Sequence, residues 1–432
     1  MVCPGRLCLG GPARADPAFR GSSPSGNVLL TESRDVDLVI IGAGLIGLAT
    51  AREIMRRRPG IRITVLDKEA RVASHQSGHN SGVIHSGIYY QPGSLKAQLC
   101  IRGARLLRSF CDERGIAHPE VGKLIVAVRE TELGRLDALF ARGQANGLPG
   151  IELVDPDGIR AIEPEATGLR AIYSPGTGIV DYPEVARALA SEVTCHGGTI
   201  LTGHRVTGLH RSNSSWWVDA SGVTIRSRAV VTCAGLESDR LATMTGAPRD
   251  PRIVPFRGEY WSLNPHGRSL VKGLIYPVPD LAFPFLGVHF TRRTDGEVWL
   301  GPNAILALAR EGYRRRDIDP RELLTLLAWP GFYRLARRYW RMGLRELSLA
   351  LNRRAFIAEL RRYVPGLAWG DIGPGPSGVR AQAVSSDGRL LDDFVFTEEE
   401  AILHVRNAPS PAATACLAIA ESIADRVALS LA

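Results

Sequence analysis

A run of small and polar residues at 77–87 brings together side chains that could contact a bound ligand. Its glycines would let the backbone pass close to a flat ring system. His79, Asn80 and Ser81 offer hydrogen bonds to ring or phosphate oxygens, and Gly82 follows them directly. A surface turn is the alternative interpretation, but the interleaved histidines favour a binding site. The residues expected to contact a cofactor here are His79, Asn80, Ser81 and Gly82.

Two histidines, His85 and His289, could accept a proton from a substrate hydroxyl group. Oxidation of a 2-hydroxy acid, for example, takes a hydride from carbon and a proton from the hydroxyl. A neutral imidazole suits the proton transfer near pH 7. A given histidine is more often structural than catalytic, and the sequence leaves open which of the two would be the base.

An arginine that follows a glycine-rich loop, Arg380, could hold a substrate carboxylate through two parallel hydrogen bonds. A structural ion pair is the alternative. Arg257 and Tyr260, near a predicted domain boundary, and Tyr276 are also expected to bind substrate in the same cleft. The sequence shows neither a Cys/His cluster with metal-ligand spacing nor a nucleophile elbow. A bound cofactor would then supply the chemistry, while the protein orients the substrate.

These residues must be positioned by a fold that begins with a strand, a glycine turn and a helix. The segment 36–41 is an almost continuous apolar run, which predicts a parallel strand buried on both faces. Gly42 allows a tight turn, Gly44 lets the backbone approach a pyrophosphate, and Gly47 lets the helix pack on the strand.

The helix predicted from 45 to about 58 ends at Pro59-Gly60, and its first turn would present N–H groups and a partial positive charge to phosphates. A second strand ends at Asp67, where an acid can accept hydrogen bonds from ribose hydroxyls. The pattern predicts a dinucleotide site but does not separate FAD from NAD. The residues predicted to hold the dinucleotide are Gly42, Gly44, Leu45, Ile46, Gly47, Asp67 and Lys68.

Later segments favour FAD, because a flavin needs a second wrap of chain around its ring. The apolar strand at 229–233 ends in the small-residue turn Ala234-Gly235 and is expected to return to the dinucleotide sheet. The segment 407–414, which contains Pro409 and Ser410, is expected to close over the flavin.

The predicted fold class is α/β: a Rossmann-like FAD-binding domain with a discontinuous α+β substrate domain built on an antiparallel sheet. The 432 residues are enough for two folding units. A disordered leader is expected over 1–34. The FAD-binding domain is predicted to comprise 35–110, 155–240 and 370–432, and the substrate domain 111–154 and 241–369.

The formal net charge of +9 is concentrated in arginines within 310–362. Apolar residues recur there at helical spacing: Phe332, Leu335, Ala336, Tyr339 and Met342. A basic amphipathic helix of this kind can lie on an anionic membrane surface, where an enzyme could reach a quinone. A solvated helix over the core is the more common alternative.

The sequence contains no apolar run of about 18 residues that would predict a membrane-spanning helix. Seven dispersed cysteines indicate a reducing compartment rather than a disulfide framework. The first residues have few acids, which is compatible with a mitochondrial transit peptide. We expect a cytoplasmic protein, peripheral on the inner face of the membrane if the basic helix binds lipid, and a mitochondrial protein if the source is eukaryotic.

Several stretches resemble the L-2-hydroxyglutarate dehydrogenase (or oxidase) family, within the glycine-oxidase-like (DAO) superfamily of FAD-dependent oxidoreductases. They lie at 79–90, 255–260, 276–280, 283–291, 301–304 and 407–414. The resemblance implies non-covalently bound FAD and oxidation of the dicarboxylate L-2-hydroxyglutarate to 2-oxoglutarate, with hydride transfer to flavin N5. Electrons would pass to a quinone or to oxygen.

The resemblance also implies that Arg380, in a Gly-x-Arg segment, holds the substrate carboxylate. Asp67 stands where the family usually has glutamate, and 314–362 departs most from the family pattern. An amine or D-amino-acid oxidase of the same superfamily is the alternative function. A flavoprotein that binds nucleic acid is a third, but the sequence has no helix-turn-helix, RNA-binding or zinc motif, so we expect no nucleic-acid partner.

Overall fold

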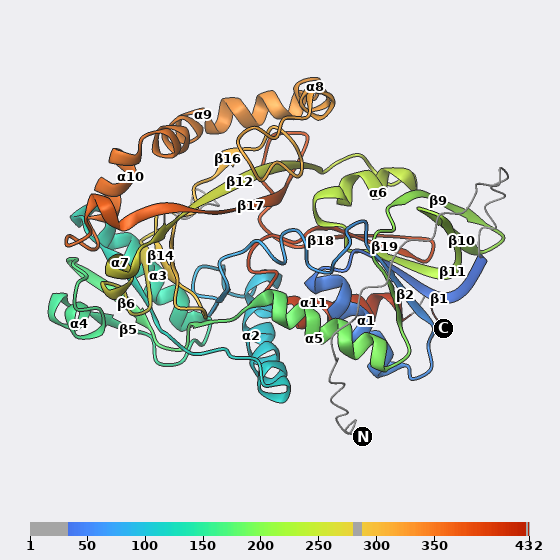
Figure 1. Ribbon diagram of the computed structural model, residues 1–432, viewed down its shortest axis with the longest axis horizontal. Helices are drawn as coiled ribbons and strands as arrows, with labels where there is room; N and C mark the ends of the chain where they lie inside the picture. Colours follow the sequence, from blue (N-terminus) through green and yellow to red (C-terminus); the bar gives the residue numbers. More distant parts are fainter. Residues whose placement is uncertain (1–32, 280–286, 429–430, 432) are drawn as a thin grey trace, which may run out of the picture.

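Two large β-sheets organise the part of the chain that the structure describes, residues 33–279, 287–428 and 431 of a computed structural model (Figure 1). The predicted leader lies outside the described residues up to position 32, and so does the 280–286 portion of the resemblance. Two short strands, β3 (Val83–Ile84) and β7 (Gly178–Ile179), pair with each other in a separate two-stranded sheet.

The first sheet contains the predicted strand, glycine turn and helix. The elements of this unit are β1 (Ser33–Ile41), α1 (Leu45–Arg57), β2 (Ile63–Leu66), α2 (Leu95–Arg114), α5 (Tyr182–Cys195), β8 (Thr199–Leu201), β9 (Val206–Ser212), β10 (Ser215–Ala220), β11 (Val223–Thr232), a 3-10 turn (Gly235–Glu237), α6 (Ser238–Met244), β18 (Val395–Glu399), β19 (Ile402–Asn407) and α11 (Cys416–Val427). Its strand order is β18-β19-β11-β1-β2-β8, with β10 attached to β11 and β9 attached to β10.

The centre of this sheet is parallel and buried on both faces, as its apolar strands predict. On β1, Leu38 lies opposite Ile63 of β2 and Ala229 of β11. Helices α1, α2, α5 and α11 form a continuous apolar core with one face of the sheet (Figure 1). The return of β11 to the dinucleotide sheet is confirmed, since β11 pairs in parallel with both β1 and β19.

The second sheet is mainly antiparallel. The elements of this unit are β4 (Lys123–Ala127), α3 (Glu130–Ala145), β5 (Glu152–Val154), α4 (Pro156–Ile162), β6 (Arg170–Ser174), β12 (Arg252–Leu263), α7 (Pro265–Ser269), β13 (Leu274–Pro277), β14 (Phe290–Arg292), β15 (Val298–Leu300), β16 (Ile305–Leu306), α8 (Pro320–Leu327), α9 (Pro330–Leu351), α10 (Arg353–Leu360), a 3-10 turn (Trp369–Asp371) and β17 (Ile372–Val384). Its order is β16-β12-β15-β14-β13-β4-β6-β5, and β17 pairs along nearly all of β12.

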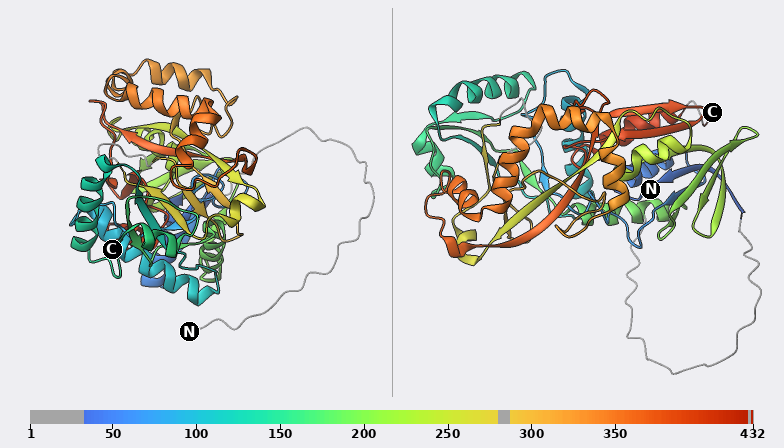
Figure 2. Two further views of the ribbon diagram at one scale, coloured as in Figure 1. Left: turned by 90° about the vertical axis from the view of Figure 1, so that its left-hand side faces the viewer. Right: turned by 90° about the horizontal axis from the view of Figure 1, so that it is seen from above.

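The arginine-rich segment forms α8, α9 and α10, which run along one outer edge of the molecule (Figures 1 and 2). Of the apolar residues that recur at helical spacing on α9, Phe332, Leu335, Tyr339 and Met342 are buried or half-buried, which fits the alternative of a helix over the core. Ala336 is exposed.

The predicted domain boundaries differ from the division between the sheets at two places. Within 155–240, β6 pairs with β4 and β5 in the second sheet. Within 370–432, β17 pairs with β12 in the same sheet. Both strands were assigned to the FAD-binding unit, because an apolar strand pattern does not reveal which distant strand will be its partner. Residues 412–415 form a turn, and the last helix, α11, begins at Cys416.

Candidate active site

Three neighbouring cavities form one extended trough along the first sheet. The first, of about 420 Å³, is lined by Gly42, Gly44, Asp67, Lys68, Ala234 and Gly235 among others. The second, of about 120 Å³, is lined by Gly44, Leu45 and Ile46. The third, of about 200 Å³, is lined by His79, Asn80, Ser81, His85, Tyr260, Arg380, Pro409 and Ser410. Gln76 lines all three cavities, so they lie next to one another.

The glycine turn at the first cavity leaves no room for side chains. Gly42 has φ +110°, and a Cβ there would lie 2.3 Å from the carbonyl oxygen of Cys233. A Cβ on Gly47 would lie 1.9 Å from the carbonyl oxygen of Gly42. Glycine is therefore required at both positions, because the turn, the helix and β11 approach one another with backbone atoms only.

Asp67 braces this turn as well as lining the cavity. Its Oδ2 accepts a hydrogen bond of 2.7 Å from the Ala43 N–H, and its Oδ1 accepts one of 2.9 Å from the Glu69 N–H. Ser77 Oγ accepts a 3.0 Å hydrogen bond from Leu45 N–H at the start of α1. These contacts fix the backbone that faces the middle of the trough.

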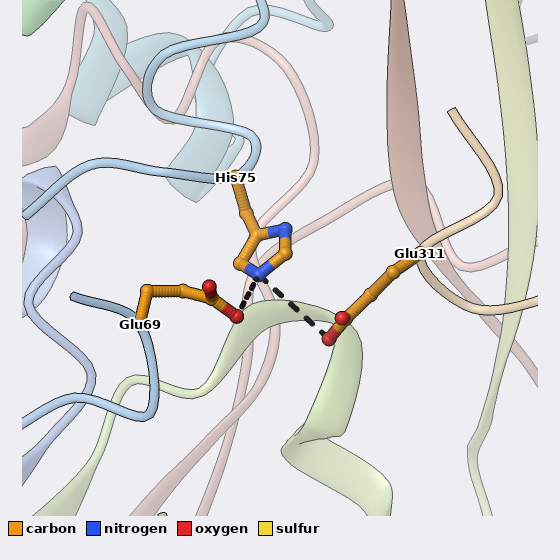
Figure 3. Close-up of side chains that lie close together, drawn as sticks. All are labelled: Glu69, His75 and Glu311. Atoms are coloured by element: carbon orange, nitrogen blue, oxygen red, sulfur yellow. Dashed lines mark hydrogen bonds and ion pairs between the residues drawn. The ribbon is translucent and has the colours of Figure 1, made fainter. Parts of the chain in front are cut away.

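Lys68 lies in a cluster of charged residues that joins the two units. Figure 3 shows the other members of the cluster, Glu69, His75 and Glu311. Glu69, His75 and Glu311 group their ligand atoms as closely as a metal site would. The Lys68 ammonium is already among them, 2.5 Å from Glu311 Oε1 and 2.8 Å from His75 Nε2, and paired with Glu69. Hydrogen bonds from Lys68 and His75 lower the pKa of Glu69 to about 2. The lysine thus supplies the positive charge that these acids require.

The loop after His75 is held by its own side chains. Asn80 Nδ2 donates to the carbonyl oxygen of Ser77 at 2.8 Å, and Asn80 Oδ1 accepts from Gly82 N–H at 2.9 Å. His79 Nδ1 lies 3.0 Å from the carbonyl oxygen of Ser377. Gly82 does not line any of the three cavities, which corrects its predicted contact with the cofactor. A Cβ there would lie 2.9 Å from Arg293 Nη1, so Gly82 permits close packing behind the loop.

His85 lies in the wall of the third cavity together with Arg380 and Tyr260. Its Nδ1 is buried and has no hydrogen-bond partner among the described residues. Burial first, and then the charge of Lys123, lower the pKa of His85 well below its usual 6.5. The imidazole is therefore neutral near pH 7 and able to accept a proton.

His289 lies deeper than His85 and does not line the cavity. Its ring stacks on Tyr276 with 4.0 Å between centroids, and its Nδ1 is 2.7 Å from the carbonyl oxygen of Gly287. Burial lowers its pKa to about 3. Tyr276 is also fully buried, with its hydroxyl 3.4 Å from Thr291 Oγ1. Of the two predicted bases, the structure brings only His85 to the cavity wall.

Arg257 is directed away from the cavity, contrary to its predicted role in substrate binding. Its Nε is 3.1 Å from Glu259 Oε1, and its guanidinium donates to the carbonyl oxygen of Arg314 at 3.1 Å. Side chains alternate between the faces of a strand, and on β12 Gly258 and Tyr260 line the cavity. Arg257 must then lie on the opposite face, where it holds the segment after β16.

Sequence reasoning missed several residues of the site. Gln76 directly precedes the run that was singled out, and its Oε1 accepts a 2.9 Å hydrogen bond from Ala381 N–H. Lys96 lines the third cavity and pairs with Asp392 at 2.7 Å. Lys123 is buried beside Tyr276. No local sequence pattern distinguishes these lysines, because a lysine near the start of a helix or strand usually extends into solvent.

The fold and the trough define a class of protein. A family model described as FAD dependent oxidoreductase (DAO) matches residues 37–426, and the chain belongs to this family. The site's construction fits the cofactor: the glycine backbone and the start of α1 face the first two cavities, and the 79–81 loop and 409–410 face the third. Gly42, Gly44, Asp67 and Gly235 would hold the adenosine diphosphate half, and the loops would flank the flavin.

Within this family the chain is similar to L-2-hydroxyglutarate dehydrogenases. It is 49% identical to the mitochondrial enzyme of Nematostella vectensis, over 93% of this chain and 92% of that protein. It is 46% identical to the mitochondrial enzyme of Homo sapiens, over 99% of both chains, and 44% identical to the enzyme of Indibacter alkaliphilus, over 90% of this chain and 98% of that one. The resemblance noted in the sequence is confirmed.

Solved structures share the fold. L-α-glycerophosphate oxidase from Mycoplasma pneumoniae, with FAD bound, superposes with a TM-score of 0.73 at 24% identity, covering 91% of this chain and 94% of that one. Glycine oxidase from Geobacillus kaustophilus gives a TM-score of 0.68 at 19% identity, covering 92% and 95%. The predicted combination of a Rossmann-like FAD-binding fold and a second sheet is confirmed.

Proposed function

We propose that this protein catalyses the FAD-dependent oxidation of L-2-hydroxyglutarate to 2-oxoglutarate. The observation that carries the proposal is that an arginine, Arg380, and a neutral histidine, His85, both line one cavity at the flavin end of the trough. The names of relatives that match nearly the whole chain support the same substrate. FAD, when bound, supplies the acceptor for the hydride.

The chain's own residues bind and orient the acid. Arg380 holds the carboxylate next to the hydroxyl-bearing carbon through paired N–H groups. Nδ1 of His85 accepts the hydroxyl proton, since burial keeps this ring neutral and no described residue bonds to that atom. His289 supports this arrangement from behind by stacking on Tyr276. Tyr260, buried in the cavity wall near Arg380, helps to exclude water.

The test is anaerobic reduction of the bound flavin. L-2-Hydroxyglutarate should bleach the flavin absorbance, and D-2-hydroxyglutarate should not. Bleaching by glycine, sarcosine or a D-amino acid, but not by the hydroxy acid, would instead identify an amine or amino-acid oxidase. Reoxidation with oxygen or a quinone analogue then identifies the electron acceptor.

Our second proposal is that a quinone accepts the electrons from the flavin, and that α8 and α9 contact the membrane. The outward side of these helices carries exposed apolar side chains: Leu324, Leu327, Tyr333, Trp340, Leu344, Leu347 and Leu351. Arginines flank this stripe on α9 at 334, 337, 338, 341 and 345. Such a surface suits adsorption to anionic lipid, with the apolar residues entering the headgroup boundary.

Among the described residues, no helix is both long and apolar enough to span a bilayer. Contact with the membrane would therefore be peripheral if it involves the described helices. We propose the inner face of the cell membrane in a bacterial source and the mitochondrion in a eukaryotic one, as the names of the eukaryotic relatives indicate for those proteins.

A further inference from the structure

Lys123, the first residue of β4, is a buried lysine that the reaction as described does not use. Its side chain is 1% exposed, and its Nζ has no hydrogen-bond partner among the described residues. The ammonium lies 4.5 Å from the ring centroid of Tyr276 and 5.2 Å from that of Tyr89. Two aromatic faces offset only part of the cost of removing an ammonium from water.

The other buried lysine near the site differs in one respect. Lys96 is 7% exposed, but Asp392 neutralises it at 2.7 Å. Lys123 has no carboxylate partner within ion-pair distance among the described residues, and desolvation lowers its pKa to about 8. A buried charge without a counter-ion is expected where a ligand supplies the opposite charge.

Lys123 lies close to the two histidines, of which His85 lines the third cavity. On β4 it shares a face with Ile125, which packs in the core that also contains Tyr276 and Val83. Its charge lowers the pKa of both His85 and His289, and so does the charge of Arg380. Two cations, one on β4 and one on β17, thus act on the same pair of histidines.

Further polar atoms close to Lys123 have no partner in the described chain. The hydroxyl of Tyr89, whose ring faces the ammonium, is buried and unbonded, and so is Nδ1 of His85. Three donors or acceptors left unbonded in one buried region indicate that a polar ligand completes them.

We propose that Lys123 binds the second carboxylate of a dicarboxylic substrate, with the Tyr89 hydroxyl as an additional donor. The proposal rests on the proposed function, because L-2-hydroxyglutarate carries one carboxylate beside the hydroxyl and another at the far end of its chain. Arg380 holds the first and Lys123 the second, so that the substrate lies with its hydroxyl beside His85. Lys123 is not itself a lining residue of the cavity, and its buried Nζ lies beside the rings of Tyr276 and Tyr89. The preference of the enzyme for a dicarboxylic over a monocarboxylic hydroxy acid then depends on Lys123 of β4.

The experiment compares two hydroxy acids of equal chain length in anaerobic flavin reduction by the holoenzyme. L-2-Hydroxyglutarate has the distal carboxylate, and L-2-hydroxyvalerate has a methyl group there. In Lys123→Met, the apparent Kd for L-2-hydroxyglutarate should rise about 10- to 100-fold, the range for loss of a charged hydrogen bond. The apparent Kd for L-2-hydroxyvalerate should change less than twofold. Lys96→Met, the matched variant of a buried but paired lysine, should affect both acids alike.

A thermal measurement separates substrate binding from a structural role. Lys123→Met should raise the Tm of the holoenzyme below about pH 8, because the variant no longer buries an unpaired ammonium. Glutarate, which lacks the hydroxyl and cannot be oxidised in this way, should raise the Tm of the wild type but not of the variant.

The inference is overturned if Lys123→Met weakens both acids equally, weakens neither, or lowers the Tm. It is also overturned if Lys96→Met alone loses the discrimination between the two acids. Failure of the wild type to be reduced by L-2-hydroxyglutarate would contradict the proposed function instead. The glutarate measurement would still test for a dicarboxylate site at Lys123 in that case.

Discussion

Gln76 Oε1 accepts a hydrogen bond of 2.9 Å from the backbone N–H of Ala381, the residue after Arg380. This bond ties the loop of the first unit to β17 of the second and lies where the three cavities meet. This side-chain amide therefore helps to set the position of Arg380 relative to the cofactor site, together with the contact between His79 and the Ser377 carbonyl oxygen.

Replacement of this amide should loosen the link. Gln76→Leu leaves the Ala381 N–H without its partner, so we expect the KM for L-2-hydroxyglutarate to rise about tenfold. FAD should also bind less tightly, as measured by fluorescence titration of the apoprotein. Gln98→Leu, at an exposed position on α2, is the matched control and should change neither quantity. Wild-type values for Gln76→Leu would show that the bond does not position Arg380.

The glycine turn provides a steric test of the cofactor site. Gly42→Ala should abolish FAD loading, because its Cβ would lie 2.3 Å from the Cys233 carbonyl oxygen. Gly60→Ala controls for backbone strain alone, since Gly60 also has a positive φ, +86°, but no atom within 4 Å of its added Cβ. The ratio of flavin to protein absorbance in each purified variant gives the answer. Full occupancy in Gly42→Ala would mean that the turn can shift without loss of binding.

His85 and His289 can be separated by their rates of flavin reduction. His85→Asn should lower the limiting rate about 10²- to 10⁴-fold, the usual contribution of a general base. His289→Asn should reduce it less than tenfold, because His289 does not line the cavity. A larger loss in His289→Asn than in His85→Asn would reverse the assignment.

The pH dependence follows from the lowered pKa of His85. The base must be neutral to act, and burial holds its pKa well below 6.5. The wild-type reduction rate should therefore be constant from about pH 6.5 to 7.5 and fall only as acid protonates the ring. A rate that halves near pH 6.5 would indicate a base with an ordinary histidine pKa.

The apolar stripe on α8 and α9 predicts lipid binding. Trp340 is 55% exposed and Leu344 57% exposed, one helical turn apart. Replacing both with aspartate should abolish co-sedimentation with vesicles rich in anionic lipid, and neutral vesicles should not bind either protein. Leu169→Asp, at an exposed apolar position 45% exposed before β6, is the control and should still bind. Equal binding by all variants would exclude this stripe as the contact.

The sequence predicts local structure here better than it predicts pairing. The turn from β1 into α1 has three glycines at fixed spacing, and backbone atoms leave no room for a side chain at Gly42 or Gly47, so its fold and its ligand class follow from neighbouring residues alone. The partner of β17 lies more than a hundred residues away along the chain, on β12, and no local pattern identifies it. The partners of β6, strands β4 and β5, lie much nearer along the chain, but no local pattern identifies them either.

The candidate site shows a similar division. Arg380 and His85 lie where motifs point, but Arg257 and Tyr260 could not be separated until the direction of each side chain on β12 was known. Lys123 could not be identified from the sequence, for a different reason. Its importance comes from the absence of a counter-ion in the described chain, which is a property of its surroundings rather than of its sequence.

The placement of β19 and α11 has a consequence for biosynthesis. These last elements complete the sheet and helical layer that begin with β1, and 408–413 closes the trough. While the chain is being synthesised, the glycine turn can leave the ribosome early, but the wall opposite it is still missing. FAD can therefore be enclosed only after residues 408–413 have been translated, so insertion of the cofactor has to follow synthesis of the second sheet.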